Sequence, residues 1–319
     1  MFNVFIDGRA GTTGLQIADR LKTREDITLV EIPHDKRKDP KIKAQILNEV
    51  DLAILCLPDA ASRESVSMIS SDRVRVLDAS TAHRTQEGWV YGLPELAPAQ
   101  REKIRMSSRV SNPGCYPTGF LLGIVPLLKA GIVAADYPVC IDAVSGYSGG
   151  GRQMIEKYQA RQAEHPDSPW SYRKYSLQLK HKHIPEMKRY SGLNHDPIFI
   201  PAVGHFEQGM LVSIPLVTRL LKKGTTAVHI HESLAEYYKK EAFINVSEPN
   251  DIDQLEDGFL SPLLCNETNR VDIMVFGNDD QAVVISRLDN LGKGAAGAAI
   301  QNLNLMLGVE EHTGLNRNR

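Results

Sequence analysis

The segment FNVFIDGRAGTTG, residues 2–14, determines how the first part of the chain is interpreted. It begins with a short apolar strand pattern, Phe2 to Ile6, and Gly14 to Leu21 follows with apolar residues at helical spacing. A glycine-rich turn from a strand into a helix lets main-chain N–H groups approach a phosphate. The spacing G-x-x-G-x-x-G differs by one position from the common G-x-G-x-x-G form. Our candidates for binding the pyrophosphate of a dinucleotide are therefore Gly8, Arg9, Ala10, Gly11, Thr12, Thr13 and Gly14.

Strand-like and helix-like patterns alternate along the first part of the chain. Apolar strand patterns cover residues 27–32, 52–57 and 74–77, and helical patterns cover residues 41–50 and 60–69 between them. Such alternation with apolar strands predicts a parallel sheet covered by helices on both faces. We therefore predict a doubly wound α/β domain, which binds its ligand at the carboxyl ends of the strands.

The pattern changes after about residue 112, where strand patterns become longer and more alternating. They predict a mixed or antiparallel sheet in a second, α+β domain, with strands at 139–145, 198–202, 210–217, 271–276 and 282–290. Helices are predicted at 116–129, 152–163, 226–240 and 292–307. A chain of 319 residues is long enough for two domains. The change of pattern places the boundary between the first, dinucleotide-binding domain and the second domain at about residue 112.

The composition excludes several classes of function. The formal net charge is −2, so a large basic field for nucleic acid or anionic lipid is absent. No apolar run approaches the ~20 residues of a membrane span, and the start of the chain lacks the basic region of a signal peptide. The 4 cysteines show no CxxC spacing, which is typical of a reducing compartment. We expect a cytoplasmic protein that acts on a small molecule and binds neither nucleic acid nor membrane.

The residues after the second strand bear on the choice of dinucleotide. Glu31 stands where an acid commonly binds the ribose 2′-hydroxyl of NAD. A basic cluster at residues 34–38 follows it, and Arg9 lies in the glycine loop. Cations at this place suit a 2′-phosphate, so we favour NADP over NAD. A solvated charged loop is the alternative interpretation of the same residues.

The segment SNPGCYPTG, residues 111–119, carries the most specific chemical signal. Pro113 and Gly114 turn the chain just before Cys115, and an apolar helical pattern begins just after it. A helix N-terminus lowers the pKa of a thiol from ~8.5 and so populates the nucleophilic thiolate. The other cysteines lie in apolar strands or in a loop without this geometry. Cys115 is our candidate nucleophile, with a buried core thiol as the alternative.

A nucleophilic cysteine needs a residue that moves a proton. The segment HKHIPE, residues 181–186, offers two histidines, His181 and His183, before a helix that begins with proline, and the segment PAVGHFEQG offers His205. The residues alone leave the choice between them open. His229 and His231 have a spacing that can bind a metal ion, but no third ligand is evident, so we expect no metal site.

A thiolate and a nicotinamide dinucleotide together define a reaction class. The thiolate adds to a carbonyl carbon, and hydride then moves between that carbon and the nicotinamide. Arg84 and Arg152 are candidates for holding a phosphate or a carboxylate of the substrate, although either could form a surface ion pair. The side chain of Asn112 and the N–H groups after Cys115 are candidates for an oxyanion site. The segment GYSGG, residues 146–150, also matches the G-x-S-x-G turn of serine hydrolases.

Several of these segments resemble one known enzyme family, and the resemblance spans nearly the whole chain. GRAGTTG, SNPGCYPTG, SGYSGGGR, HKHIPE and NLGKGAAGAAIQNLNLM resemble the N-acetyl-gamma-glutamyl-phosphate reductases, and PAVGHFEQGM resembles their shorter, type 2 branch. The chain is more distantly similar to aspartate-semialdehyde dehydrogenases. The resemblance implies NADPH-dependent reduction of N-acetyl-L-glutamyl 5-phosphate to N-acetyl-L-glutamate 5-semialdehyde and phosphate, through a cysteine thioester. This reaction belongs to arginine biosynthesis.

The resemblance also implies roles for individual residues. Cys115 would form the thioester, His183 would act as acid and base, and Gly292 and Gly294 would lie near the nicotinamide. The helix from Asn290 would return to the first domain, so residues 1–112 with 290–319 would form a Rossmann-like domain that binds NADP. Residues 113–289 would then be the catalytic and oligomerisation domain, paired through its sheet in a homo-oligomer, a dimer or tetramer. Three alternatives remain at this point: a dehydrogenase of the aspartate-semialdehyde or N-acetyl-aminoadipyl-phosphate type, a non-catalytic NADP-binding module, and a serine hydrolase.

Overall fold

The computed structural model describes residues 1–33, 36 and 39–317. The chain divides into two compact units: unit 1 contains Met1–Gly114 and Ala295–Leu315, and unit 2 contains Cys115–Gly294 and the chain from Asn316. Residues 290–294, which we had assigned to the first domain, therefore belong to unit 2. The reason is local, because the N–H of Gly294 donates to the carbonyl oxygen of Asp289 at 2.9 Å and so continues the turn that ends the last strand.

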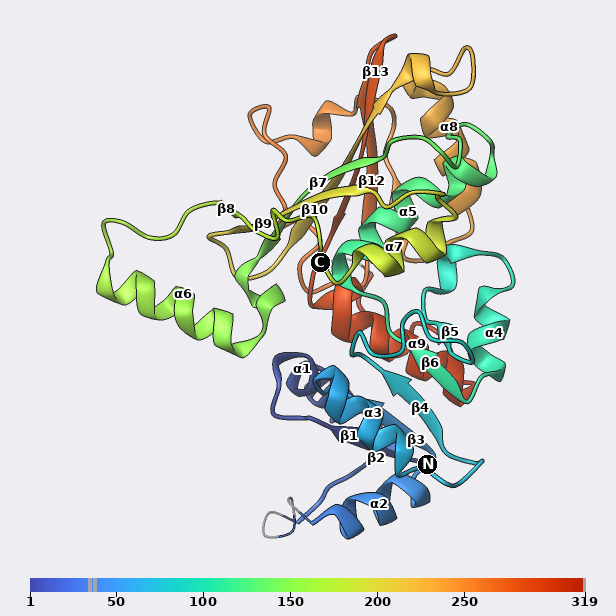
Figure 1. Ribbon diagram of the computed structural model, residues 1–319, viewed down its shortest axis with the longest axis vertical. Coiled ribbons are helices and arrows are strands. Elements are labelled where there is room, and N and C mark those ends of the chain that lie inside the picture. The colour runs from blue at the N-terminus through green and yellow to red at the C-terminus, as the bar shows by residue number, and fades with distance from the viewer. Residues whose placement is uncertain (34–35, 37–38, 318–319) are drawn as a thin grey trace. The chain divides into compact units, whose positions relative to one another are not determined.

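Unit 1 is built on a parallel sheet with strand order β2-β1-β3-β4-β6-β5 (Figure 1). Its strands are β1 (Phe2–Asp7), β2 (Ile27–Val30), β3 (Leu52–Leu55), β4 (Arg75–Asp78), β5 (Val90–Tyr91) and β6 (Arg109–Ser111). β1 pairs with β2 on one side and with β3 on the other, so the order of the strands reverses at β1. This reversal creates the crevice in which doubly wound sheets bind ligands. The predicted doubly wound architecture is confirmed.

The helices of unit 1 come from both ends of the chain. They are α1 (Thr12–Leu21), α2 (Pro40–Glu49), α3 (Asp59–Ser67), α4 (Gln100–Met106) and α9 (Gly297–Leu307). Asn302 ties α9 to this unit, because its amide donates to the carbonyl oxygen of Gly92 at 2.8 Å. The sequence pattern missed β5, β6 and α4, since strands of 2 and 3 residues and a mostly exposed helix give no clear periodicity.

Unit 2 is built on a mixed sheet with strand order β11-β12-β13-β10-β7-β9-β8. Its strands are β7 (Cys140–Gly146), β8 (Arg173–Lys174), β9 (Ile198–Gly204), β10 (Met210–Val217), β11 (Ile244–Val246), β12 (Val271–Gly277) and β13 (Gln281–Leu288). β10 is antiparallel to both β13 and β7, whereas β7 and β9 are parallel. Its helices are α5 (Cys115–Lys129), α6 (Arg152–Glu164), α7 (Ile184–Ser191) and α8 (Ala227–Tyr238). The predicted mixed sheet is confirmed.

One face of this sheet carries α5, which is buried along most of its length (Figure 1). Two glycines allow the close approach: a Cβ on Gly119 would lie 2.8 Å from a methyl of Val212, and a Cβ on Gly123 would lie 2.9 Å from a methyl of Ile214. Side chains of the opposite face stay partly exposed, among them Leu211, Val283 and Ile285. Among the described residues, no helix has the length and apolar character needed to cross a membrane.

Candidate active site

The glycine loop of unit 1 connects β1 to α1. Gly8 has a φ of +85°, and a Cβ on it would lie 2.3 Å from the carbonyl oxygen of Cys56. A Cβ on Gly14 would lie 2.6 Å from the carbonyl oxygen of Gly8, so both positions require glycine. Gly11 precedes α1, and neither a side-chain cap nor an acidic residue occupies the first turn of that helix. The first amides of α1 can therefore bind an anion.

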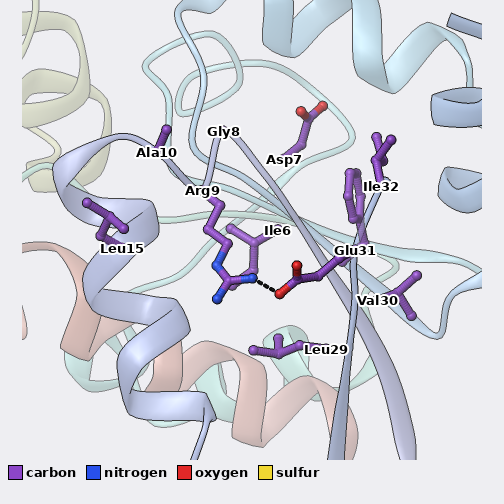
Figure 2. Close-up of a pocket in the computed structure, with 11 residues that line it drawn as sticks. Ile6, Asp7, Gly8, Arg9, Ala10, Leu15, Leu29, Val30, Glu31 and Ile32 are labelled. Carbon is purple, nitrogen blue, oxygen red and sulfur yellow. Dashed lines mark hydrogen bonds and ion pairs between the residues drawn. The ribbon is translucent and has the colours of Figure 1, made fainter. Parts of the chain in front are cut away.

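A pocket of about 520 Å³ lies beside this loop, between the ends of β1 and β2 (Figure 2). Ile6, Leu15 and Ile32 contribute apolar wall, and the Arg9 guanidinium forms an ion pair with the Glu31 carboxylate at the pocket. A volume in this range accommodates a nucleotide-sized ligand. The loop, the free helix start and the pocket therefore fit the adenosine and pyrophosphate of a dinucleotide.

The prediction of NADP rests on Arg9 and on the basic cluster at residues 34–38, and only some of these residues are described in the structure. Arg9 lies at the pocket, and Lys36 is described, with its N–H bonded to the carbonyl oxygen of Pro33. The remaining positions of the basic cluster, residues 34, 35, 37 and 38, lie outside the described residues.

Arg84 and Asn112 form hydrogen bonds with other groups of unit 1. Arg84 is 7% exposed, and it donates to the carbonyl oxygens of Asn112 at 2.9 Å and Ala79 at 3.1 Å. The Asn112 amide donates to Ala295 at 3.0 Å and accepts from Asn302 at 3.0 Å. Both side chains thus hold the turn that leads to Cys115. Their predicted roles in binding substrate and oxyanion stay predictions.

Cys115 is the first residue of α5 and is partly exposed. The structure therefore confirms that Cys115 lies at a helix N-terminus, as predicted. A Cβ on Gly294 would lie only 2.8 Å from the Cβ of Cys115, and a Cβ on Gly292 would lie 2.3 Å from the carbonyl oxygen of Thr268. Both glycines belong to a single π-helical turn, Gly292–Ala296, and such turns are frequent at functional sites. Gly294 therefore packs directly against Cys115, and the predicted contact of Gly292 and Gly294 with the nicotinamide stays a prediction.

His183 lies near the start of α5. Its ring centroid is 6.1 Å from that of Tyr116, the residue next to Cys115, and His181 is 6.2 Å from the same ring. His183 is 7% exposed and precedes α7 as its N-cap residue. Burial lowers the pKa of His181 to about 4. Tyr116 carries no signal in the sequence that would mark it as a site residue, and His181 is predicted only as one of the two histidines of HKHIPE.

His205 lies in different surroundings. It is exposed, and its ring centroid is 6.4 Å from that of Tyr147 and 6.1 Å from that of Tyr158. His183 thus packs beside Tyr116, the residue next to Cys115, whereas His205 packs beside Tyr147 and Tyr158.

The environments of two other thiols oppose reactivity. Burial raises the pKa of Cys56 to about 12. Burial, followed by the charge of Asp272, raises the pKa of Cys265 to about 11, and the Cys265 sulfur lies 3.3 Å from an Asp272 oxygen. Thiolate is scarce at both positions near neutral pH. Cys115 differs from both, because it is partly exposed and begins a helix.

The remaining candidates have other partners. Arg152 is largely exposed and forms a surface ion pair with Glu156 at 2.7 Å, one turn along α6. The Ser148 hydroxyl accepts a hydrogen bond from the Asn290 amide at 2.9 Å, whereas a nucleophilic serine needs a base there. Among residues 1–33, 36 and 39–317, no three His, Cys, Asp or Glu side chains are grouped as a metal site.

Family models match both parts of the chain. The model described as semialdehyde dehydrogenase, NAD binding domain, matches residues 3–104, and the model described as semialdehyde dehydrogenase, dimerisation domain, matches residues 115–290. The chain is 54% identical to N-acetyl-gamma-glutamyl-phosphate reductase 2 of a Nostoc species, over 98% of each chain. It is 48% identical to N-acetyl-gamma-glutamyl-phosphate reductase of Burkholderia cenocepacia, over 96% of this chain and 97% of that one.

Solved structures share the fold at low sequence identity. Aspartate semialdehyde dehydrogenase II of Vibrio cholerae, complexed with ASA, superposes with a TM-score of 0.72 at 16% identity, covering 97% of this chain and 98% of that one. Aspartate semialdehyde dehydrogenase with NADP from Candida albicans gives a TM-score of 0.63 at 13% identity, covering 96% and 98%. These two likenesses establish the architecture alone.

Proposed function

The chain belongs to the N-acetyl-gamma-glutamyl-phosphate reductases of the semialdehyde dehydrogenase family, and we propose that it reduces N-acetyl-L-glutamyl 5-phosphate to N-acetyl-L-glutamate 5-semialdehyde. The reaction consumes NADPH, releases phosphate and supplies arginine biosynthesis. The full-length identity of 54% to a reductase of this name, together with a partly exposed thiol at the start of α5, carries the proposal.

Each residue has a defined task in this reaction. Cys115 attacks the acyl phosphate as thiolate, and phosphate leaves as the thioester forms. NADPH supplies a hydride when it is bound. His183 donates a proton to the oxygen that carries negative charge as the thiohemiacetal forms, and main-chain N–H groups at the start of α5 stabilise that charge. As the thiohemiacetal collapses, its hydroxyl proton returns to His183, the C–S bond breaks, and the aldehyde and the thiolate of Cys115 are released.

In unit 1, the proposal assigns cofactor binding to the loop from Gly8 to Gly14. The glycines let the pyrophosphate approach the amides of α1, and the neighbouring pocket takes the adenosine. Arg9 supplies a cation for a 2′-phosphate, which supports NADP as the dinucleotide. Arg84 and Arg152 remain candidates for holding substrate phosphate or carboxylate, with Asn112 as a candidate at the oxyanion.

The reverse reaction offers the direct test. N-acetyl-L-glutamate 5-semialdehyde, NADP⁺ and phosphate should give NADPH, followed by absorbance, and omission of phosphate should abolish turnover. Aspartate semialdehyde and the semialdehyde that is one methylene longer serve as competing substrates. If either is used with a higher kcat/KM, the assignment of the substrate is wrong.

We further propose that the protein is a cytoplasmic homo-oligomer paired through the sheet of unit 2. The partly exposed side chains of Leu211, Val283 and Ile285 lie on the face of that sheet opposite α5, where a second copy would bury them. Sedimentation at micromolar concentration should give a dimer or tetramer, and Ile285→Asp should shift it to monomer. A monomeric unaltered protein contradicts this proposal.

A further inference from the structure

The segment between β8 and α7 has an unusual backbone. The N–H of Tyr175 donates to the carbonyl oxygen of Pro201 at 3.0 Å, which attaches the start of the segment to β9. Ser176 and Leu179 have φ values of +53° and +56°, in the left-handed region that non-glycine residues adopt at a cost. Such strain persists only where neighbouring contacts hold it, and His181 stands at the end of the segment.

One hydrogen bond defines the tautomer of His181. The N–H of His183 donates to Nδ1 of His181 at 3.1 Å, so Nδ1 carries a lone pair. Burial lowers the pKa of His181 to about 4, and the charge of Lys182 lowers it further, so the ring is neutral at pH 7. The single ring proton is therefore on Nε2. The Tyr175 hydroxyl oxygen, 3.4 Å from Nε2, accepts that hydrogen bond.

Two tyrosines lie beside this histidine pair. The Tyr116 hydroxyl donates to the carbonyl oxygen of Ala202 at 2.9 Å, and its ring packs edge-on against His181 with a centroid distance of 6.2 Å. The Tyr175 ring also packs edge-on against His181, with a centroid distance of 5.6 Å. A directed pair of hydrogen bonds thus runs from the main chain of His183 through His181 to the hydroxyl of Tyr175.

We propose that His181 is a positioning residue for the proton-transfer step. Its Nδ1 holds the main chain of His183, its Nε2–H holds the hydroxyl of Tyr175, and its ring packs edge-on against Tyr116, the residue next to Cys115. Ring contacts also restrain the His181 side chain, because its ring centroid lies 4.7 Å from that of His183 and 5.1 Å from that of Phe199. The proposal rests on the proposed function, since it needs His183 to serve Cys115.

The surroundings of His181 are otherwise well defined. The titratable groups that face it are Tyr175, His183 and Tyr116, with Cys115 next along the chain from Tyr116, and the charged neighbour is Lys182. Burial raises the pKa of Tyr175 to about 12, and negative charge on Cys115 raises it as well. Tyr175 therefore stays protonated and keeps its hydrogen bonds across the working range of pH.

Two substitutions of His181 separate positioning from general structural support. His181→Ala removes both ring nitrogens, and we expect kcat to fall by about ten- to a hundredfold with the affinity for NADPH unchanged. His181→Asn places a carbonyl oxygen near the position of Nδ1, so it can again accept from the N–H of His183. We expect His181→Asn to recover most of kcat, and His181→Gln, which reaches toward Tyr175 instead, to recover less.

The second readout needs neither substrate nor cofactor. Alkylation of Cys115 by iodoacetamide, followed across pH by mass spectrometry, reports the thiolate population. We expect the midpoint of this profile to rise in His181→Ala and to return in His181→Asn, because His183 regains its place. His195→Ala, which removes an exposed histidine beyond the end of α7, is the matched control and should change neither kcat nor the profile.

The outcomes are distinguishable. Equal kcat and equal alkylation midpoints in His181→Ala and His181→Asn overturn the positioning role. If His181→Ala does not fold, the kcat values of His181→Asn and His181→Gln are compared instead. Equal kcat in these two variants also overturns the positioning role. If the unaltered protein reduces no acyl phosphate while the alkylation midpoints shift as expected, the proposed function has failed and the positioning of His183 stands.

Discussion

Replacing Gly294 by alanine tests how closely Cys115 has to be placed. The new Cβ would lie 2.8 Å from the Cβ of Cys115 and 3.1 Å from the carbonyl oxygen of Asp289. Two carbon atoms rest about 3.5–4.0 Å apart, so relief of the contact needs a shift of roughly 1 Å. A shift of that size at a reacting group costs on the order of 100-fold in rate. We expect Gly294→Ala to lower kcat by about this factor.

The same substitution also overpacks the interior, and a control has to separate the two effects. Overpacking costs about 1–3 kcal/mol, which lowers the melting temperature by several degrees. Gly123→Ala, in the middle of α5, places a Cβ 2.9 Å from a methyl of Ile214, so the steric change is similar but lies two turns from Cys115. It should lose no more stability than Gly294→Ala, because the methyl that it meets is the flexible end of Ile214, and it should keep kcat within about threefold.

The assay is steady-state reduction, with the Cys115 alkylation rate as the local readout and calorimetry for stability. Gly294→Ala should combine a hundredfold lower kcat with a changed alkylation rate. A folded Gly294→Ala protein with normal kcat would refute the reasoning, and so would an equal loss of kcat in Gly123→Ala.

Three further predictions concern the proposed catalytic residues and the proposed positioning residue His181. Cys115→Ser should lower kcat by at least about 10³-fold and leave NADPH binding, measured by fluorescence, intact; an active serine variant would remove thioester chemistry. His183→Asn should lower kcat by about 10²-fold or more, whereas His205→Asn should lower it by less than about threefold; the reverse order would move the acid–base role to His205. His181 has a folded pKa of about 4, below the ordinary value of 6.5, so the unfolded chain binds its proton first as pH falls. Its contribution should make the free energy of unfolding fall between pH 6.5 and 4, and this pH dependence, measured in urea, should weaken in His181→Asn; an unchanged slope would contradict it.

The sequence predicted those parts of the fold whose causes are local. The apolar β1, the glycine loop and α1 follow one another within residues 2–21, so spacing alone indicates the strand, the turn and the helix. Cys115 at the start of α5 is similar, because Pro113 and Gly114 mark the turn just before it. The short elements β5 and β6 carry no such pattern, since their places depend on the strands beside them.

Contacts between distant residues could not be predicted in this way. Gly294 packs on Cys115 although most of unit 2 separates them in the chain, and only the fold reveals why that position needs glycine. In the sequence, Arg84 has the features expected of a substrate-binding arginine. In the structure, its guanidinium donates to the main-chain carbonyl oxygens of Asn112 and Ala79. The main-chain N–H of Tyr175 is bonded to the carbonyl oxygen of Pro201. The polar sequence around Tyr175 does not predict this contact.

The covalent thioester on Cys115 is the central claim, and it can be observed directly. N-acetyl-L-glutamate 5-semialdehyde and NADP⁺, mixed with the protein in the absence of phosphate and quenched in acid, should leave an N-acetylglutamyl group on the peptide that contains Cys115. Mass spectrometry should detect this group, and added phosphate should remove it. A protein that turns over but carries no such group, or carries it on another residue, would contradict the account.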